Sequence, residues 1–277
     1  MKILVTGANG FLGRGIVDEI IKTGNTVIAA GFKTDKVSEK AIHIDGDMFE
    51  VDDPYEYYGH PDVLLHLAYK DGFVLNSDAH IQNIIQHTNF INKMIASGIQ
   101  QVAVMGTMHE IGFFEGSVNE HTPTNPMNFY GIAKSAIREY TSLVAKNNGV
   151  VMQWLRAFYI VDGTAYGNSI FSKLFAAAER GETSFPFTTG KSQYDFLDYG
   201  TFAKYVAVAV TQTEIKGIIN ISSGEPERLS ERVEKFIVDN HLNIKLDYGA
   251  FPDRPFDSKA IWGDNTKIQK IMSNQRK

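Results

Sequence analysis

The sequence contains no cysteine among its 277 residues. Disulfide bonds and thiolate chemistry are therefore excluded, and nothing indicates a cross-linked secreted framework. A surplus of positive charge is also lacking: the formal net charge is −5, whereas a nucleic-acid-binding surface needs a basic stripe. No apolar run approaches the length of a membrane span, and residues 1–21 lack the pattern of a signal peptide. We expect a cytoplasmic protein that binds neither nucleic acid nor membrane.

Internal repeats and low-complexity tracts are absent as well. Apolar residues at 43% and charged residues at 21% are typical of a soluble globular protein. The length fits one large domain or two modest ones, and we expect no metal site.

The most informative stretch is the first one, where an apolar run from Ile3 to Val5 precedes Gly7, Gly10 and Gly13. Apolar residues at helical spacing follow the glycines. A strand, a glycine turn and a helix in this order bring unpaired backbone N–H groups and a positive helix end against a diphosphate. Three glycines alone are a weak signal, but their position after a buried-type strand matches the dinucleotide fingerprint.

Apolar runs and amphipathic stretches then alternate through about residue 160, which predicts an α/β fold of Rossmann type with a doubly wound parallel sheet. Strands are expected at residues 3–5, 26–30, 41–44, 63–67, 102–105, 150–155 and 218–221. Helices are expected after the glycine turn and at about residues 78–97, 130–146, 170–180, 201–210 and 231–240, while residues 185–187 read as irregular and 244–248 as strand-like.

The alternating pattern breaks after the strand at 150–155, which indicates a second, smaller unit. We expect a dinucleotide-binding Rossmann domain from residues 1–157 plus about 200–222. The remaining residues, about 158–199 plus 223–277, are expected to form a small, discontinuous C-terminal lobe that binds substrate.

A second constellation lies at Tyr130 and Lys134, which are four residues apart on an expected helix and therefore share a face. A nearby ammonium favours the phenolate and lowers the pKa of a tyrosine, so the pair can exchange a proton with an alcohol or carbonyl oxygen. Thr107 ends the expected strand just upstream and can donate a hydrogen bond to the same oxygen. An isolated pair of this kind is more often an ordinary surface pair, but its occurrence with the glycine turn favours catalysis.

Together these residues resemble the extended short-chain dehydrogenase/reductase family, in its nucleotide-sugar epimerase/dehydratase branch. The matching motifs extend from residue 2 to about residue 268. They include TGANGFLG at 6–13, HLA at 66–68, YGIAK at 130–134 and GIINISSGE at 217–225.

The resemblance implies roles for the residues at matching positions. Thr107, Tyr130 and Lys134 would form the catalytic group, and Lys134 would also hold the nicotinamide ribose. The residues implied to bind the dinucleotide are Gly7, Asn9, Gly10, Phe11, Leu12, Gly13, Asp47, Met48, Leu67, Ala68, Tyr130 and Lys134. Those expected to face the nucleotide-sugar are His109, Tyr159, Asn168 and Arg254.

Two departures from the family pattern carry information. Gly31 stands where NAD enzymes of this type usually place an aspartate that binds the adenosine ribose, and Lys33 nearby could pair with a 2′-phosphate. The cofactor is therefore expected to be NAD or NADP, with NADP favoured. Met108 and His109 replace the acidic pair of the sugar dehydratases, which argues against dehydration. His109 either lines the pocket or acts as an additional acid/base.

These features predict an NAD(P)-dependent oxidoreductase that transfers a hydride at a ring carbon, C4, of a nucleotide-diphospho-sugar. It would act as a 4-keto-sugar reductase or as a 4-epimerase. Two alternatives remain open: a non-catalytic NAD(P)-binding sensor or partner protein, and a reductase of a non-sugar carbonyl compound. The family also implies a homodimer formed through the helices at about 78–97 and 130–146.

Overall fold

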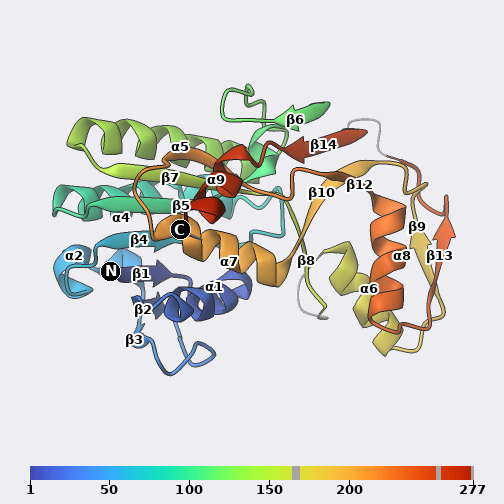
Figure 1. The fold of residues 1–277 in the computed structure, drawn as a ribbon, viewed down its shortest axis with the longest axis horizontal. Helices are drawn as coiled ribbons and strands as arrows, with labels where there is room; N and C mark the ends of the chain where they lie inside the picture. The colour runs from blue at the N-terminus through green and yellow to red at the C-terminus, as the bar shows by residue number, and fades with distance from the viewer. Residues whose placement is uncertain (164–168, 254–256, 276–277) are drawn as a thin grey trace.

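A parallel sheet forms the centre of the larger part of the molecule in a computed structural model that describes residues 1–163, 169–253 and 257–275 (Figure 1). The sheet has seven strands, and the chain order reverses direction between β1 and β4. Such a reversal opens a crevice at the carboxyl ends of the strands, where open α/β folds bind ligands. In spatial order the strands are β11 (Gly217–Ile221), β7 (Val151–Ala157), β5 (Gln101–Thr107), β4 (Val63–His66), β1 (Lys2–Thr6), β2 (Thr26–Gly31) and β3 (Ile42–Asp45).

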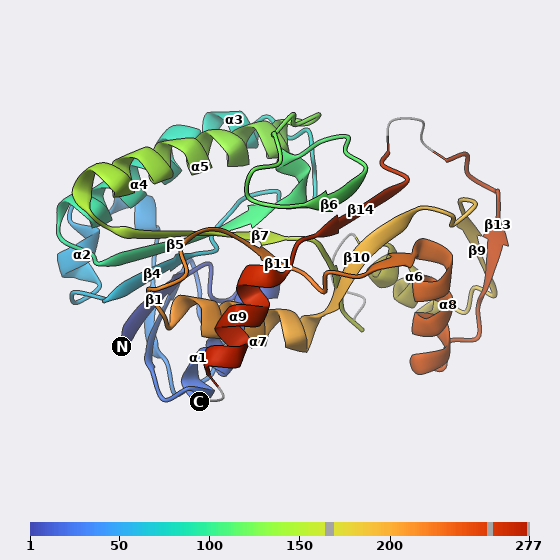
Figure 2. The ribbon, with the colours of Figure 1, turned by 45° about the horizontal axis from the view of Figure 1, so that its top comes forward.

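Helices cover both faces of this sheet, as the doubly wound prediction requires (Figure 2). One face carries α1 (Phe11–Lys22), α7 (Tyr199–Val210) and α9 (Thr266–Asn274). The other carries α3 (Ala79–Gln82), α4 (Ile84–Ala96) and α5 (Phe129–Asn148), with the short α2 (Pro54–Tyr57) and the 3-10 turns Met48–Glu50 and Met108–Glu110 at strand ends. Because both faces are covered, the central strands read as continuous apolar runs.

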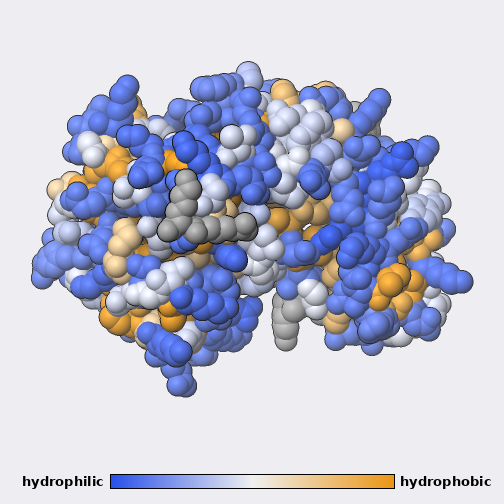
Figure 3. Space-filling view, viewed as in Figure 1, coloured by the Kyte–Doolittle hydropathy of each residue, from blue (hydrophilic) through white to orange (hydrophobic). Residues whose placement is uncertain are grey.

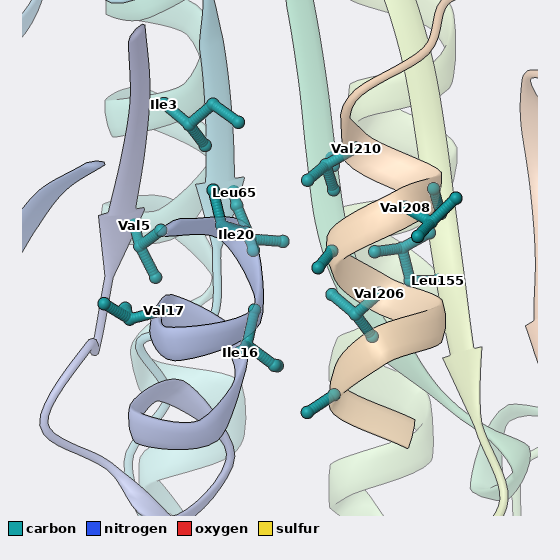
Figure 4. Close-up of a cluster of buried hydrophobic side chains, with 14 of the residues drawn as sticks. Ile3, Val5, Ile16, Val17, Ile20, Leu65, Leu155, Val206, Val208 and Val210 are labelled. Atoms are coloured by element: carbon teal, nitrogen blue, oxygen red, sulfur yellow. The ribbon is translucent and has the colours of Figure 1, made fainter. Parts of the chain in front are cut away.

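The core under α1 and α7 is made of branched aliphatic side chains (Figure 4). Ile16 and Ile20 of α1, Val206 of α7 and the strand residues Val5 and Leu65 belong to one cluster, and all five are fully buried (Figure 4). This packing fixes the glycine turn, because the turn connects β1, a strand of the sheet, to α1, which packs against that sheet.

A smaller part of the molecule surrounds a second sheet. Its strands are β12 (Pro226–Arg228), β10 (Gln193–Asp198), β14 (Ala260–Gly263) and β6 (Gly116–Val118), with β8 (Tyr159–Val161) also paired to β10. A separate strand pair, β13 (Lys245–Tyr248) and β9 (Ser184–Phe187), and the helices α6 (Ile170–Glu179) and α8 (Leu229–Asp239) complete it. These elements share one hydrophobic cluster, distinct from the two that sandwich the large sheet.

Several elements differ from the sequence-based expectation. Residues 185–187, expected to be irregular, belong to β9, and the expected single helix at 78–97 is divided at Asn83 into α3 and α4. Two segments pack with the other part of the molecule than the sequence-based domain bounds assign them to. β6 pairs with β14 in the second sheet, whereas α9 packs on the large sheet through Ile268 and Ile271.

The face shown in Figure 3 is mostly hydrophilic, with small hydrophobic areas between polar side chains. Among the described residues, no helix combines the length and the apolar character that crossing a membrane requires.

Candidate active site

A cavity of about 920 Å³ lies between the two parts of the molecule, at the carboxyl ends of β1, β4 and β5. At one end it is lined by the glycine turn, through Gly7, Gly10 and Gly13 together with Phe11 and Leu12. At the other end aromatic and aliphatic side chains of the smaller part line it: Phe158, Tyr159, Ile160, Phe171, Tyr194 and Phe196. The cavity therefore has two chemically different ends, a glycine turn at one and an aromatic lining at the other.

The glycine turn has the close approaches that a dinucleotide fingerprint requires. Gly7 has a φ of +68°, and a Cβ there would lie 2.7 Å from the Cα of Ala68. A Cβ on Gly13 would lie 2.4 Å from the carbonyl oxygen of Ala8. The N-terminus of α1 starts after Gly10, which makes no side-chain capping bond. The first N–H groups of the helix have no acceptor within the helix, and they belong to residues that line the cavity, so this donor set fits a diphosphate.

Other residues expected to bind the dinucleotide lie around the turn rather than along the cavity. The Asn9 amide donates to Asp35 over 3.1 Å and accepts from the N–H of Lys36 over 2.8 Å, so it holds the loop after β2. Asp47 caps the turn at Met48–Glu50 by accepting from the N–H of Phe49. Of the other expected residues on this side, only Leu67 lines the cavity; Lys33 is exposed, Met48 is buried and Ala68 packs against Gly7.

The structure brings Thr107, Tyr130 and Lys134 together along the cavity wall. Thr107 ends β5, and α5 begins one residue before Tyr130, where the Asn128 side chain accepts from the N–H of Gly131 over 2.8 Å. A Cβ on Gly131 would lie 2.3 Å from the carbonyl oxygen of His109. The absence of a side chain there lets the first turn of α5 pack directly on the segment that follows Thr107.

Burial dominates the electrostatics of this group. It raises the pKa of the Tyr130 hydroxyl to about 12, against a hydrogen bond from the Thr107 hydroxyl that lowers it. Burial also lowers the pKa of the Lys134 ammonium to about 7. Tyr130 is therefore a neutral phenol at pH 7: it carries a proton that it can donate, but burial makes it a weaker acid than an exposed tyrosine.

The expected lowering of the Tyr130 pKa by Lys134 is wrong, and the geometry gives the reason. The Lys134 ammonium donates to the carbonyl oxygen of Met105 over 2.9 Å and lies 3.8 Å from the centre of the Tyr69 ring. Its distance to the centre of the Tyr130 ring is 5.9 Å. The cation is thus held by a carbonyl and a cation–π contact with Tyr69.

The residues expected to face the sugar are only partly described. The ring of His109 lies 5.9 Å from that of Tyr130, and burial lowers the pKa of His109, so this side chain is neutral at pH 7. Tyr159 stacks at a tilt on Tyr194, with ring centres 4.6 Å apart. Both His109 and Tyr159 line the cavity. Asn168 and Arg254 lie outside the described residues.

Two residues of the site were not predicted. Tyr69 lines the cavity beneath Lys134, and its position directly after the HLA motif was the available signal. Glu110 is fully buried and accepts a hydrogen bond from the N–H of Thr107 over 2.9 Å. A glutamate three residues after a threonine is the pattern of a capping box, which the structure forms here.

The sequence of this chain is similar to those of known proteins. A sequence model described as the NAD dependent epimerase/dehydratase family matches residues 3–222. A curated relative from Aggregatibacter actinomycetemcomitans, dTDP-6-deoxy-L-talose 4-dehydrogenase (NAD(+)), is 36% identical over 272 residues, which is 95% of this chain and 99% of that protein. A putative UDP-glucose 4-epimerase from Methanocaldococcus jannaschii is 24% identical, over 97% of this chain and 92% of the relative.

Solved structures share the fold. UDP-glucose 4-epimerase from Thermotoga maritima, solved with UDP-glucose, has a TM-score of 0.81 at 21% identity and covers 98% of this chain and 92% of its own. The Thermus thermophilus UDP-glucose 4-epimerase, solved with NAD, has a TM-score of 0.79 at 18% identity, with 100% and 94% covered. At these identities the likeness concerns the fold alone.

Proposed function

Because the chain belongs to the NAD dependent epimerase/dehydratase family, we propose that it is an oxidoreductase acting at C4 of a nucleoside-diphospho-sugar. The observation that carries this proposal is the shared cavity. One end presents the glycine turn and the N-terminus of α1, and the wall beyond it presents Thr107, Tyr130 and Lys134. A dinucleotide and a second ligand would therefore meet at Tyr130.

Different residues of the chain have different roles in the proposed reaction. The N–H groups at the start of α1 bind the diphosphate, and a bound nicotinamide supplies or accepts the hydride. Thr107 orients the sugar oxygen at C4, and Tyr130, protonated at pH 7, donates a proton to that oxygen as the carbonyl is reduced. Lys134, which is only partly protonated at pH 7, lies beside the site, where it can bind a ribose hydroxyl. His109, Tyr159, Asn168 and Arg254 would contact the nucleotide-sugar.

Between the two outcomes open to this machinery, the dehydrogenase/reductase is favoured. The relative that is 36% identical over nearly the full length of both chains is a 4-dehydrogenase whose name gives dTDP-6-deoxy-L-talose as substrate, whereas the epimerases are at most 27% identical. We therefore take a thymidine-diphospho-6-deoxyhexose as the substrate class. The second candidate is a 4-epimerase, the activity given in the names of more distant sequence relatives.

The cofactor of this reaction is proposed to be NAD(H). Gly31 and the exposed Lys33 favour NADP, but two carboxylates lie near them. Asp45 is the register partner of Gly31, and Asp35 is tied to the glycine turn through Asn9. Negative charge at this position would repel a 2′-phosphate. The name of the 4-dehydrogenase relative specifies NAD(+) as well.

The test is a turnover assay of the purified protein with dTDP-6-deoxy-L-talose and NAD⁺ or NADP⁺. We expect reduced nicotinamide to accumulate in step with a 4-keto product, faster with NAD⁺. Formation of the C4 epimer without net reduced nicotinamide would identify an epimerase. Binding of the dinucleotide with no turnover of any nucleotide-sugar would favour a sensor, and turnover of simple ketones alone would favour a non-sugar reductase.

Replacing Tyr130 by phenylalanine checks the assigned acid/base role. Loss of a general acid is expected to reduce kcat by roughly 10²- to 10⁴-fold, with dinucleotide binding retained. Tyr58→Phe is the matched control, because Tyr58 is also buried, burial raises its pKa to about 12, and it does not line the cavity. An equal loss in both variants, or none in Tyr130→Phe, would contradict the role.

We also propose that the protein is a homodimer formed through α4 and α5. Exposed apolar side chains occur on both helices and on the short α3 just before α4: Ile81 on α3, Ile85 on α4, and Ile132, Tyr140 and Leu143 on α5. The two helices α4 and α5 pack against each other. Exposed apolar side chains gathered on two helices that pack together are typical of protein interfaces.

A further inference from the structure

A carboxylate lies buried behind the catalytic group, outside the cavity. Glu110 has no exposed surface, and it does not line the cavity. One of its oxygens accepts from the backbone N–H of Thr107 over 2.9 Å and from the indole N–H of Trp154 over 2.7 Å. Its other oxygen accepts from the Arg138 guanidinium over 2.6 Å and lies 3.7 Å from that of Arg156.

This arrangement connects the elements that carry the proposed catalytic residues. Thr107 stands at the end of β5, whereas Arg138 lies on α5, four residues after Lys134 and eight after Tyr130. Residues at these spacings follow one face of a helix. A single carboxylate group therefore links the backbone of Thr107 to the helix that presents Tyr130 and Lys134.

An ion pair in this place is costly, because two charges must leave water and an apolar pair of similar volume would pack as well. Arg138 also has a second, exposed partner, since its guanidinium donates to Glu139 over 2.6 Å. Packing alone therefore does not explain a buried glutamate beneath Thr107. A role that requires the charge of Glu110, and the hydrogen bonds that both of its oxygens accept, would explain why this residue is buried here.

We propose that Glu110 is a positioning residue for the proposed C4 reaction, fixing Thr107 against α5 and setting the charge around the proton-transferring pair. The inference rests on the proposed function of Thr107 and Tyr130. The charged and titratable groups that face Glu110 or respond to its charge are Arg138, Lys134 and Tyr130 on α5 and Arg156 on β7. The negative charge of Glu110 raises the pKa of both Tyr130 and Lys134.

Glu110→Gln tests the proposal, because glutamine keeps the shape and an acceptor for the Thr107 N–H but removes the charge. We expect kcat to fall roughly 10- to 100-fold, since a small misplacement of a reacting group can cost that much, while KM for the dinucleotide stays unchanged. In the oxidation direction, in which Tyr130 must lose its proton, the half-maximal rate is expected at lower pH than in the natural protein. Glu139→Gln is the control, because it removes a carboxylate from the same arginine without touching Thr107.

Arg138→Met provides a second variant should Glu110→Gln not fold. It breaks the link to α5 and leaves the charge of Glu110 less neutralised, so kcat should fall and the pH profile should move in the opposite direction, to higher pH. Active variants with unchanged kcat and pH profile, or a loss matched by Glu139→Gln, would overturn the positioning role. A natural protein that turns over no C4 substrate would instead overturn the proposed function.

Discussion

The sequence predicts the position of Lys134 on its helix, but it does not predict the burial and the contacts of this side chain. It is 3% exposed, with its ammonium above the ring of Tyr69 and bonded to one backbone carbonyl. Its spacing from Tyr130 was evident from the sequence, and its presence in the cavity wall agrees with that spacing. Its desolvation and its contact with Tyr69 depend on how β4 and β5 pack against α5, which no local pattern reveals.

The lowered pKa of Lys134 predicts a pH-dependent stability. With a pKa of about 7 in the folded protein and the ordinary 10.5 when unfolded, the unfolded chain keeps a proton between pH 7 and 10 that the folded protein has released. The free energy of unfolding should therefore rise with pH in this window, by up to about 1.4 kcal/mol per pH unit. Lys134→Met removes this contribution, so its stability relative to the natural protein should decline from pH 7 to 10.

Denaturant unfolding of the two proteins at several pH values measures this difference. Lys146→Met, an exposed change on the same helix, is the control and should keep a constant difference from the natural protein. A constant difference for Lys134→Met too would show that Lys134 does not titrate in this range.

At the scale of elements, burial decided which strands could be predicted. The central strands of the large sheet were recognisable because both faces are covered and their residues are nearly all apolar. β10 (QYDFLD) mixes polar and apolar residues, and β14 (AIWG) is only four residues long, so neither carries such a signal. β9 contains Pro186, which argues against a strand interior but is tolerated here because β9 pairs with β13 alone.

In the site, too, some residues could be predicted from the sequence and others could not. Short, contiguous motifs identified the glycine turn, Thr107, Tyr130 and Lys134, and the cavity contains all of them. Glu110 and Tyr69 act through partners distant in sequence, such as Trp154 for Glu110 and Lys134 for Tyr69. Those contacts exist only after β5, β7 and α5 have assembled.

The glycine turn itself allows a matched comparison. Gly7 and Gly24 both have positive φ, +68° and +80°, but a Cβ on Gly24 would meet nothing within 4 Å, whereas one on Gly7 would lie 2.7 Å from Ala68. Gly24→Ala is expected to lower the free energy of unfolding by about 1–2 kcal/mol, the cost of the left-handed backbone. Gly7→Ala should cost more and also weaken dinucleotide binding, because the turn must move away from Ala68.

Denaturant unfolding and a dinucleotide titration of both variants measure these effects. Equal costs, with dinucleotide binding intact in Gly7→Ala, would show that the close approach to Ala68 is not required.

At the scale of the whole molecule, the exposed apolar side chains on α4 and α5 predict the assembly state. Ile85 and Leu143 are 68% and 60% exposed. Ile85→Glu and Leu143→Glu should convert a dimer to a monomer, because burying an unpaired carboxylate at the interface is unfavourable. Val238→Glu, at the 71% exposed Val238 on α8, is the control and should leave the dimer intact.

Sedimentation or light scattering of the purified proteins gives the mass in solution. A natural protein that is monomeric at all concentrations, or a dimer unaffected by both glutamates, would contradict an interface on these helices.

The path of the chain between its two sheets has a consequence for how new specificities can arise. β6 leaves the first part to join the second sheet, β8 follows directly on β7, α7 returns after β10, and α9 ends against the large sheet after β14. Neither part is a contiguous segment of the chain, so recombination at a single junction cannot exchange the smaller part for another. A chimera that replaces the smaller part would need several junctions to be compatible at once, whereas substitutions and loop changes leave this shared scaffold in place.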